Sequence, residues 1–424
     1  MPVMTYQNLE KDLEIMAPAG SYESLMAAIK AGAGSVYFGI EGLNMRARSA
    51  NNFTEEDLRR ICDICREAGV KSYLTVNTII YDSDLALMRN IVDAAKDAGI
   101  SAIIASDVAV MQYARSIGVE VHLSTQLNIC NVEALRFYAR FADVVVLARE
   151  LSLEQVKQIY ETIEKEEIKG PGGELIRIEM FVHGALCMAV SGKCYLSLHE
   201  LNSSANRGAC GQICRRAYTV KDKDTGIELD IENEYIMSPK DLKTIHFINK
   251  MVDAGVRVFK IEGRARGPEY VYTVVKAYKE ALQACCNGTF EEADVEEWNS
   301  RLSTVFNRGF WDGYYSGKRL GEWTSRYGSD ATKEKVYIGK INKYFSNIEV
   351  AEVEIQTGEL SVGDEILITG PTTGLIRMTV DEIRFDLKPV EKAVKGQCIS
   401  FKVPEKVRPN DKVYLFRDRP LQIS

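Results

Sequence analysis

The feature that most constrains the fold is a regular alternation of short apolar segments with amphipathic helical segments, which continues from Leu13 to about residue 285. The apolar segments are nearly continuous in hydrophobic residues, as parallel strands covered on both faces should be. In chain order they are LEIMAPA, SVYFGI, KSYLTVN, AIIAS, VEVHLST, DVVVLA, LIRIEMFVH and VRVFKIEG. Strands that alternate with helices in this way predict an α/β fold, a (β/α)8 TIM-like barrel.

A doubly wound open sheet is the competing α/β fold. It is disfavoured because no GxGxxG sequence follows the first apolar segment, and because the alternation does not break at a middle strand. Local signals indicate where several helices begin. Thr54 with Asp57 forms a capping box, as does Ser152 with Gln155, and the SPKDL segment that starts at Ser238 predicts a further helix start.

Two changes in composition divide the chain. Residues 309–333 are rich in Gly and aromatic residues and are predicted to be a linker, or a loop packed on the barrel. Residues 334–424 alternate apolar and polar positions between Gly, Asn and Asp turns, which predicts a small C-terminal antiparallel β-barrel domain. Residues 1–308 are then a catalytic barrel that carries a Cys-rich insert at 184–236.

Four of the ten cysteines, Cys187, Cys194, Cys210 and Cys214, lie within this insert. Such a set indicates either a metal or iron–sulfur site or two disulfides. The N-terminal segment lacks the basic start and apolar core of a signal peptide, and no apolar run is long enough to span a membrane. We therefore expect a cytoplasmic protein, in which structural disulfides are rare. The loops are wider than the paired CxxC knuckles of zinc ribbons, which mildly favours a cluster over zinc.

The charge pattern does not decide whether the protein binds RNA. The net charge of −7 excludes a global basic field that would attract nucleic acid. The insert is nevertheless locally basic, through Lys193, Arg207, Arg215 and Arg216. These side chains either contact phosphates or belong to a solvated loop, and the pattern alone leaves both interpretations open.

Polar residues that follow the predicted strands mark a second candidate site, because barrel active sites lie at the carboxyl ends of the strands. Several arginines in one pocket would suit a carboxylate or phosphate ligand, although each could also form a structural salt bridge. The arginine candidates are Arg46, Arg48, Arg149 and Arg264, and the catalytic candidates are Glu150, His183 and Glu262. His183 lies four residues before Cys187, so a Cys–His nucleophile pair must also be weighed. A cysteine committed to a cluster, however, cannot also be a free nucleophile.

The segment EMFVHGALCMAVSGKCYLS resembles the signature of the collagenase-like peptidase family, family thirty-two of the peptidases of unassigned mechanism. Further segments resemble family blocks across nearly the whole chain: MAPAGSYESLMAAIKAGAGSVYFG, LSTQLNICN, VVLARELSL, SPKDL, KIEGRARGPEYV and FNRGFWDGYY. The family name records an old protease assignment. Better-understood members are prephenate-dependent RNA hydroxylases and related oxygen-independent hydroxylation factors of quinone synthesis, which hold a 4Fe-4S cluster on four cysteines.

The size of the chain and its single C-terminal β domain are most similar to the tRNA uridine 5-hydroxylase branch. This resemblance implies 5-hydroxylation of the wobble uridine of tRNA, with prephenate as co-substrate and a paralogous family member as a potential partner. It places the 4Fe-4S cluster on Cys187, Cys194, Cys210 and Cys214. Some relatives carry a cysteine just after the SPKDL block, where this chain has Lys243, so Cys214 is the fourth ligand expected here.

The resemblance also suggests roles for the charged residues. Arg46, Arg48, Arg149 and Arg264 would bind the two carboxylates of prephenate. Lys193, Arg207, Arg215 and Arg216, together with the β domain, would contact tRNA phosphates. The runner-up function is a collagenase-like peptidase, metal- or thiol-dependent, based on the family name and on His183 near Cys187. A third possibility is a non-catalytic RNA-binding partner.

Overall fold

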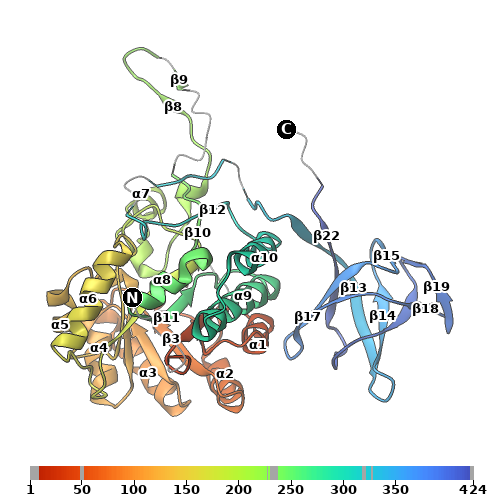
Figure 1. Ribbon diagram of the computed structural model, residues 1–424, viewed down its shortest axis with the longest axis horizontal. Coiled ribbons are helices and arrows are strands. Elements are labelled where there is room, and N and C mark those ends of the chain that lie inside the picture. Colours follow the sequence, from red (N-terminus) through yellow and green to blue (C-terminus); the bar gives the residue numbers. More distant parts are fainter. Residues whose placement is uncertain are drawn as a thin grey trace.

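The computed structural model of the chain describes residues 9–47, 52–226, 228–229, 237–317, 321–325 and 328–420. Arg48, one of the predicted arginines, lies outside the described residues. Figure 1 shows two bodies, a barrel wrapped in helices and a separate domain formed by the C-terminal strands.

The first body is a closed barrel of parallel strands that alternate with helices, which confirms the predicted TIM-like fold. The strands follow one another in chain order from β1 to β7, and β11 closes the ring by pairing with both β7 and β1. The strands of the ring are β1 (Glu14–Pro18), β2 (Ser35–Phe38), β3 (Lys71–Val76), β4 (Ala102–Ala105), β5 (Val121–Leu123), β6 (Val144–Val146), β7 (Arg177–Gly184) and β11 (Val256–Ile261).

Helices cover the outside of the ring (Figure 1). They are α1 (Tyr22–Lys30), α2 (Glu55–Glu67), α3 (Leu85–Asp97), α4 (Val108–Ser116), α5 (Val132–Tyr138), α6 (Leu153–Lys165), α8 (Ile248–Asp253), α9 (Pro268–Asn287) and α10 (Glu292–Ser303). One large cluster of buried hydrophobic side chains joins these helices to the strands. A smaller cluster of buried side chains gathers Met16, Tyr37, Tyr73, Ala102, Ile104, Val144 and Val258.

Side-chain caps fix the starts of two helices as predicted. The backbone N–H of Asp57 donates to Thr54 Oγ1 at 3.3 Å, and the Asp57 carboxylate accepts from the backbone N–H of Thr54 at 2.9 Å. Ser152 and Gln155 form the same reciprocal pair at the start of α6. Each pair satisfies two backbone donors that the first helical turn leaves without partners.

The prediction that a helix begins at Ser238 is wrong. Residues Asp241–Lys243 form a short strand, β10, and the helix α8 begins only at Ile248. β10 pairs antiparallel with the end of β7 and parallel with β12 (Phe310–Trp311). A local Ser-Pro-x-Asp signal cannot compete with these strand contacts, since tertiary pairing overrides intrinsic helix preference.

The Cys-rich insert leaves the carboxyl end of β7. It contains α7 (Leu196–Leu201) and a small antiparallel pair, β8 (Val220–Lys221) with β9 (Glu228–Leu229). Figure 1 shows the β8–β9 segment projecting away from the barrel on the side where the insert lies. The insert therefore covers the end of the barrel at which active sites of this fold are built.

The second body is an antiparallel β domain, as predicted. Its main sheet has the strand order β17-β16-β22-β13-β14-β21-β18-β19, and β15 pairs with β20. One buried hydrophobic cluster forms its core. The strands are β13 (Lys333–Phe345), β14 (Val350–Ile355), β15 (Glu359–Ser361), β16 (Glu365–Gly370), β17 (Gly374–Thr379), β18 (Ile383–Phe385), β19 (Lys388–Val390), β20 (Lys392–Val394), β21 (Cys398–Lys402) and β22 (Lys412–Asp418).

The β domain contacts the side of the barrel rather than its insert-covered end (Figure 1). Across the contact, Lys335 Nζ lies 2.8 Å from a carboxylate oxygen of Glu269 on α9. A small buried cluster also spans the two bodies and consists of Ala27, Leu367, Leu375 and Phe416. Burial of these apolar side chains holds the domains together.

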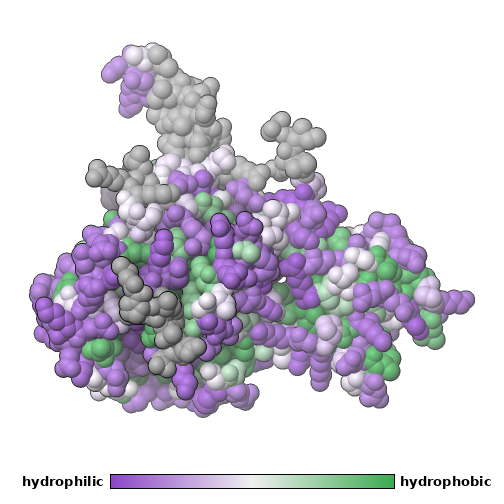
Figure 2. Space-filling model, in the orientation of Figure 1, coloured by the Kyte–Doolittle hydropathy of each residue, from purple (hydrophilic) through white to green (hydrophobic). Residues whose placement is uncertain are grey.

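The surface is largely hydrophilic on the face drawn in Figure 2, with hydrophobic residues in scattered patches. Scattered apolar residues are normal on a folded protein. Among the helices of the described residues, none combines the length and the apolar character needed to cross a membrane.

Candidate functional site

A cavity of about 250 Å³ lies between the carboxyl ends of the barrel strands and the Cys-rich insert. The two candidate sites suggested by the sequence therefore form one site. The predicted residues that line it are Arg46, Arg149, Arg215, Glu262, Arg264, Cys187, Cys194, Cys210 and Cys214. No residue of β13–β22 is among its described lining residues, so the β domain takes no part in the wall.

All four cysteines of the insert line this cavity, and none of them forms a disulfide. Burial raises the pKa of the Cys187 thiol and of the Cys214 thiol, and the neighbouring thiols raise both further. No group of three or more His, Cys, Asp or Glu side chains in the described part of the chain is arranged to hold a single metal ion. A 4Fe-4S cluster takes one thiolate per iron, and the four thiols in this cavity match that donor set in number and kind.

Arg46 and Glu262 form an ion pair in the cavity wall. Arg46 Nη2 lies 3.0 Å from Glu262 Oε1, and the Glu262 side chain is only 15% exposed. Burial alone would raise the pKa of Glu262, but Arg46, Arg266 and Arg149 outweigh it and lower the pKa. Glu262, a predicted catalytic residue, is thus held as a carboxylate among cations.

Arg149 stacks on an aromatic ring inside the cavity. Its guanidinium carbon lies 3.7 Å from the centroid of the Phe181 ring, and Nη1 donates to the carbonyl oxygen of Ala185 at 3.2 Å. Its buried Nε has no hydrogen-bond partner among the described residues. Stacking fixes the plane of the guanidinium and leaves donor capacity for a ligand.

Arg264 is almost fully buried and is held by three side chains. Its Nη1 donates to Thr75 Oγ1 at 3.1 Å, and its Nη2 donates to Asn44 Oδ1 at 3.0 Å and to Asn52 Oδ1 at 2.7 Å. Burial lowers the pKa of Arg264 to about 10. The Nε has no partner among the described residues. Arg264 is therefore a well-fixed positive group at the cavity wall.

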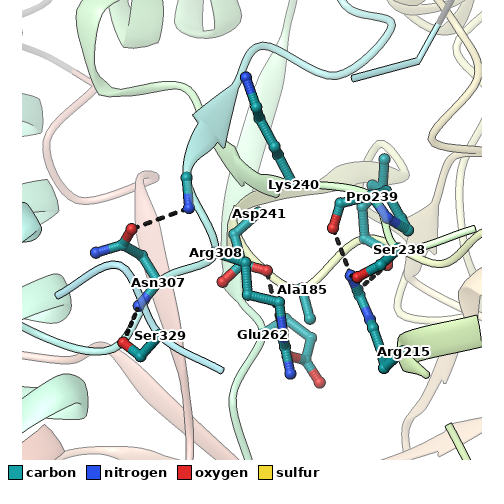
Figure 3. Close-up of polar contacts among 12 residues, drawn as sticks. Ala185, Arg215, Ser238, Pro239, Lys240, Asp241, Glu262, Asn307, Arg308 and Ser329 are labelled. Atoms are coloured by element: carbon teal, nitrogen blue, oxygen red, sulfur yellow. Dashed lines mark hydrogen bonds and ion pairs between the residues drawn. The ribbon is translucent and has the colours of Figure 1, made fainter. Parts of the chain in front are cut away.

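Two further arginines, Arg266 and Arg308, line the cavity but were not predicted from the sequence. Both stack on Phe306, with guanidinium carbons 3.4 Å and 5.0 Å from the ring centroid. Arg308 Nη1 also lies 3.4 Å from Asp241 Oδ1. Figure 3 shows the two side chains pointing toward each other. Burial raises the pKa of Asp241, and Arg308 opposes that effect. The spacing of these arginines in GRARG and FNRGF is the sequence signal that could have identified them.

The four basic residues predicted to contact RNA divide into two pairs. Arg207 and Arg215 are held by the protein itself: Arg207 Nη1 donates to Ile79 O at 2.7 Å, and Arg215 Nη2 donates to Leu186 O at 2.8 Å. Figure 3 shows Arg215 directed at the 238–239 segment. Lys193 and Arg216 are exposed instead, and Arg216 forms a surface ion pair. Of the four, Lys193 and Arg216 are therefore the two that are exposed enough to reach a large ligand.

Neither His183 nor Glu150 is among the residues that line the cavity. His183 is 1% exposed, and its ring lies 5.6 Å from the Tyr278 ring of α9, on the outside of the barrel. Burial and, to a smaller extent, the nearby positive charge of Lys243 lower the pKa of His183 to about 3. Glu150 is exposed to solvent. The structure therefore does not bring His183 and the cysteines together as lining groups of one cavity.

Lys260 is another charged lining residue that was not predicted from the sequence. It lies in β11 and is 5% exposed. The rule that barrel sites lie at the ends of the strands does not identify Lys260, because this residue lies within a strand. A lysine inside the apolar segment VRVFKIEG was the available signal, because buried lysines are rare unless they are paired.

With this geometry in view, comparisons with known proteins identify the family. The family model described as peptidase family U32 matches residues 20–325, which include the insert and every strand of the barrel except β1. The chain belongs to peptidase family U32.

Proteins that are similar to this chain carry names of two kinds. A protein of Porphyromonas gingivalis named collagenase is 74% identical over 408 residues, covering 96% of this chain and 99% of that one. The tRNA hydroxylation protein P1 of Bacillus subtilis is 31% identical over 415 residues, covering 95% and 94%. A ribosomal RNA 5-hydroxycytidine synthase of Escherichia coli is 34% identical over 320 residues, covering 73% of this chain and 46% of that one. These names support an enzyme but describe two different chemistries.

Proposed function

We propose that this U32 protein is a tRNA-modifying enzyme that hydroxylates the wobble uridine at carbon 5, with prephenate as co-substrate. In this proposal a 4Fe-4S cluster is bound by Cys187, Cys194, Cys210 and Cys214. The main observation in support of this proposal is that these four thiols and a set of arginines line the same cavity. The full-length similarity to a tRNA hydroxylation protein supports the same conclusion.

The arginines of the cavity are the reason for proposing a small ligand with two negative charges. Arg46, Arg149 and Arg264 line one cavity in which Glu262 is the single carboxylate among the described lining residues. Prephenate carries two carboxylates, and guanidinium groups bind carboxylates through paired hydrogen bonds. Arg149 supplies a stacked guanidinium with an unused donor, and Arg264 a buried one. These residues would orient the ligand beside the thiols.

The cluster, when bound, would supply electron transfer or activation of a ligand. The chain's own residues supply the enclosure. Leu186 and Cys187 of the insert and Phe181 of β7 line the same cavity, so the insert shields the ligand from solvent. Exclusion of water strengthens the attraction between arginine and carboxylate, because charges interact more strongly at low dielectric constant.

RNA would approach from the insert side. Lys193 and Arg216 are exposed there, on the segment that carries Cys194 and Cys214. Exposed cations can neutralise phosphates, and the remainder of the tRNA could reach the β domain on the side of the barrel. An enzyme of tRNA acts in the cytoplasm, which is the location we propose, and a paralogous family member remains the proposed partner.

A peptidase is the second candidate, because the P. gingivalis relative of 74% identity is named collagenase. A thiol peptidase needs a histidine beside its cysteine. No histidine is among the described residues that line the cavity. Cleavage of denatured collagen that is lost in Cys187→Ala but survives iron removal would favour this candidate.

The test combines nucleoside mass spectrometry with cofactor analysis. A strain without this gene, complemented with wild type or with Cys187→Ser, should regain 5-hydroxyuridine derivatives in tRNA only with wild type. Protein purified without oxygen should be brown and contain about four irons per chain. Restoration by Cys187→Ser, or an active colourless protein that contains zinc, would overturn the cluster assignment. An unchanged nucleoside profile in the deletion strain would count against tRNA as substrate, once paralogues are also deleted.

A further inference from the structure

A buried ion pair joins two strands of the barrel. Lys260 Nζ of β11 lies 2.6 Å from Glu179 Oε1 of β7, and the two side chains are 6% and 0% exposed. Lys260 lines the cavity that also contains the arginines and the cysteines. Its Nζ lies 4.9 Å from the Tyr37 ring centroid and 5.5 Å from that of Phe181. The Lys260 amine therefore lies near two aromatic rings at the cavity wall, and the Glu179 carboxylate is directly beside it.

Stability does not account for this pair. The interior of a TIM barrel is usually filled with branched apolar side chains, and a buried ion pair is often no more stable than apolar residues of similar size. The pair also leaves a polar atom unsatisfied, since Glu179 Oε2 has no hydrogen-bond partner among the described residues. By contrast, the ion pair between Glu14 and Lys71 is in contact with solvent, because the Lys71 side chain is 54% exposed. A costly, incompletely satisfied pair at a cavity indicates a chemical role.

The groups around Lys260 indicate the class of ligand with which its amine can react. The guanidinium groups of Arg149 and Arg264 line the same cavity, and each has a buried Nε without a partner among the described residues. Guanidinium groups bind a carboxylate, whereas an amine can add to a carbonyl carbon. A molecule with both groups next to each other is a 2-oxo acid. Its carboxylate would pair with an arginine while its carbonyl carbon faces Lys260.

We propose that Lys260 is a nucleophile that forms a Schiff base with the carbonyl of a 2-oxo acid, and that Glu179 transfers the protons. Glu179 accepts a proton from the Lys260 ammonium, and the free amine attacks the carbonyl carbon to give a carbinolamine. Glu179 returns the proton as the hydroxyl group leaves as water. An ammonium and a ketone thus become a protonated imine and one water, without any oxidant or reductant. This inference rests on the proposed function only in that prephenate carries a 2-oxo acid side chain.

The test is reductive trapping on the full-length protein with its cofactor. The protein is incubated with pyruvate, or with prephenate, and then with sodium cyanoborohydride, which reduces an imine to a stable amine. Peptide mass spectrometry should locate the adduct on Lys260. Lys243, a partly buried lysine outside the cavity lining, is the internal control and should remain unlabelled. Lys260→Arg, which keeps a positive charge beside Glu179, should abolish the adduct, whereas Lys243→Arg should not change it.

Glu179→Gln tests the proton-transfer role. It removes the proton acceptor while keeping the size of the side chain, so we expect trapping at Lys260 to slow about tenfold or more. If Lys260→Arg does not fold, the site of labelling in the wild type still decides the question. Labelling spread evenly over surface lysines, or absence of an adduct on Lys260 at ligand concentrations that saturate binding, would overturn the proposal.

The outcomes separate this inference from the proposed function. Trapping on Lys260 with an unchanged tRNA profile in the deletion strain would keep the Schiff base and reject tRNA as substrate. Loss of 5-hydroxyuridine in that strain, together with prephenate binding but no adduct on Lys260, would keep the hydroxylase and reject the Schiff base.

Discussion

Arg215 Nη2 donates a hydrogen bond to the carbonyl oxygen of Leu186 at 2.8 Å, and this contact joins the two ends of the segment that carries the four cysteines. Leu186 directly precedes Cys187, and Arg215 directly follows Cys214. The same guanidinium donates from Nη1 to Ser238 Oγ at 2.9 Å. One side chain therefore sets the spacing between the first and the last cysteine.

We expect Arg215→Ala to reduce iron content by more than half while leaving the barrel folded. The substitution removes hydrogen bonds from a charged donor to buried acceptors, each worth about 1.5–3 kcal/mol. Iron analysis of anaerobically purified protein, together with circular dichroism, measures both effects. Arg216→Ala is the matched control, because Arg216 makes only a surface ion pair with Glu200 among the contacts described. Equal iron content in the two variants would contradict the role of Arg215.

Arg149→Ala should weaken prephenate binding about ten- to hundredfold, because a charged hydrogen-bond donor in an enclosed cavity contributes about 1.5–3 kcal/mol. Isothermal titration calorimetry measures the dissociation constant. Arg140→Ala is the control, since Arg140 also stacks on an aromatic ring, that of Phe137, but is exposed and does not line the cavity. Unchanged affinity in Arg149→Ala would show that the ligand site lies elsewhere.

Gly39→Ala should displace the guanidinium of Arg264. A Cβ atom at Gly39 would lie 2.5 Å from Arg264 Nη2 and 2.8 Å from Asn44 Cγ, closer than van der Waals contact allows. We expect a lower melting temperature and weaker prephenate binding, because the side chains that hold Arg264 can no longer do so. Gly321→Ala, whose added Cβ would meet its nearest atom at 3.5 Å, should leave both quantities unchanged. Wild-type behaviour of Gly39→Ala would contradict the tight packing at Arg264.

The pKa of Glu14 in the folded protein predicts how the stability of the barrel depends on pH. Burial would raise its pKa, but Lys71, Arg177 and the Tyr73 hydroxyl outweigh burial and lower the pKa from 4.5 to about 2. A carboxyl group with a depressed pKa in the folded state stabilises that state above its unfolded pKa and loses the effect as pH falls. We therefore expect the free energy of unfolding to fall by about 3 kcal/mol between about pH 4.5 and about pH 2.

Urea unfolding at several pH values checks this prediction. Glu14→Gln should be less stable than wild type at neutral pH and should lack this part of the acid dependence. Glu67→Gln, at an exposed position on α2, should retain the wild-type dependence. The prediction fails if Glu14→Gln and wild type lose stability in parallel on acidification.

Much of the fold could be predicted from the sequence, because the alternation of strand and helix is a local pattern repeated many times. The segment around Ser238 shows where local patterns fail. Its cap residues indicate a helix, but Leu242 pairs with Gly184 of β7 and with Trp311 of β12. Both partners are distant in sequence, so no local signal reports them.

The site was predicted in part. Arg46, Arg149, Glu262 and Arg264 follow strands and line the cavity, because the topology of a barrel places such residues at one end. His183 was predicted by the same rule, but it lies within β7 and its ring packs against α9. The direction of a side chain at the end of a strand depends on register, and a register shift lies between Lys260 and Ile261 where β11 pairs with His183 of β7. Sequence alone does not reveal such a shift.

The insert provides both the four thiols and one wall of the cavity. In the proposed enzyme, the segment that binds the cofactor is therefore also a segment that encloses the substrate. In such an enzyme a shortage of iron would leave the cluster unassembled, and the shortage would appear as missing modifications in the tRNA of the cell. The decoding properties of that tRNA would then follow the iron supply of the cell.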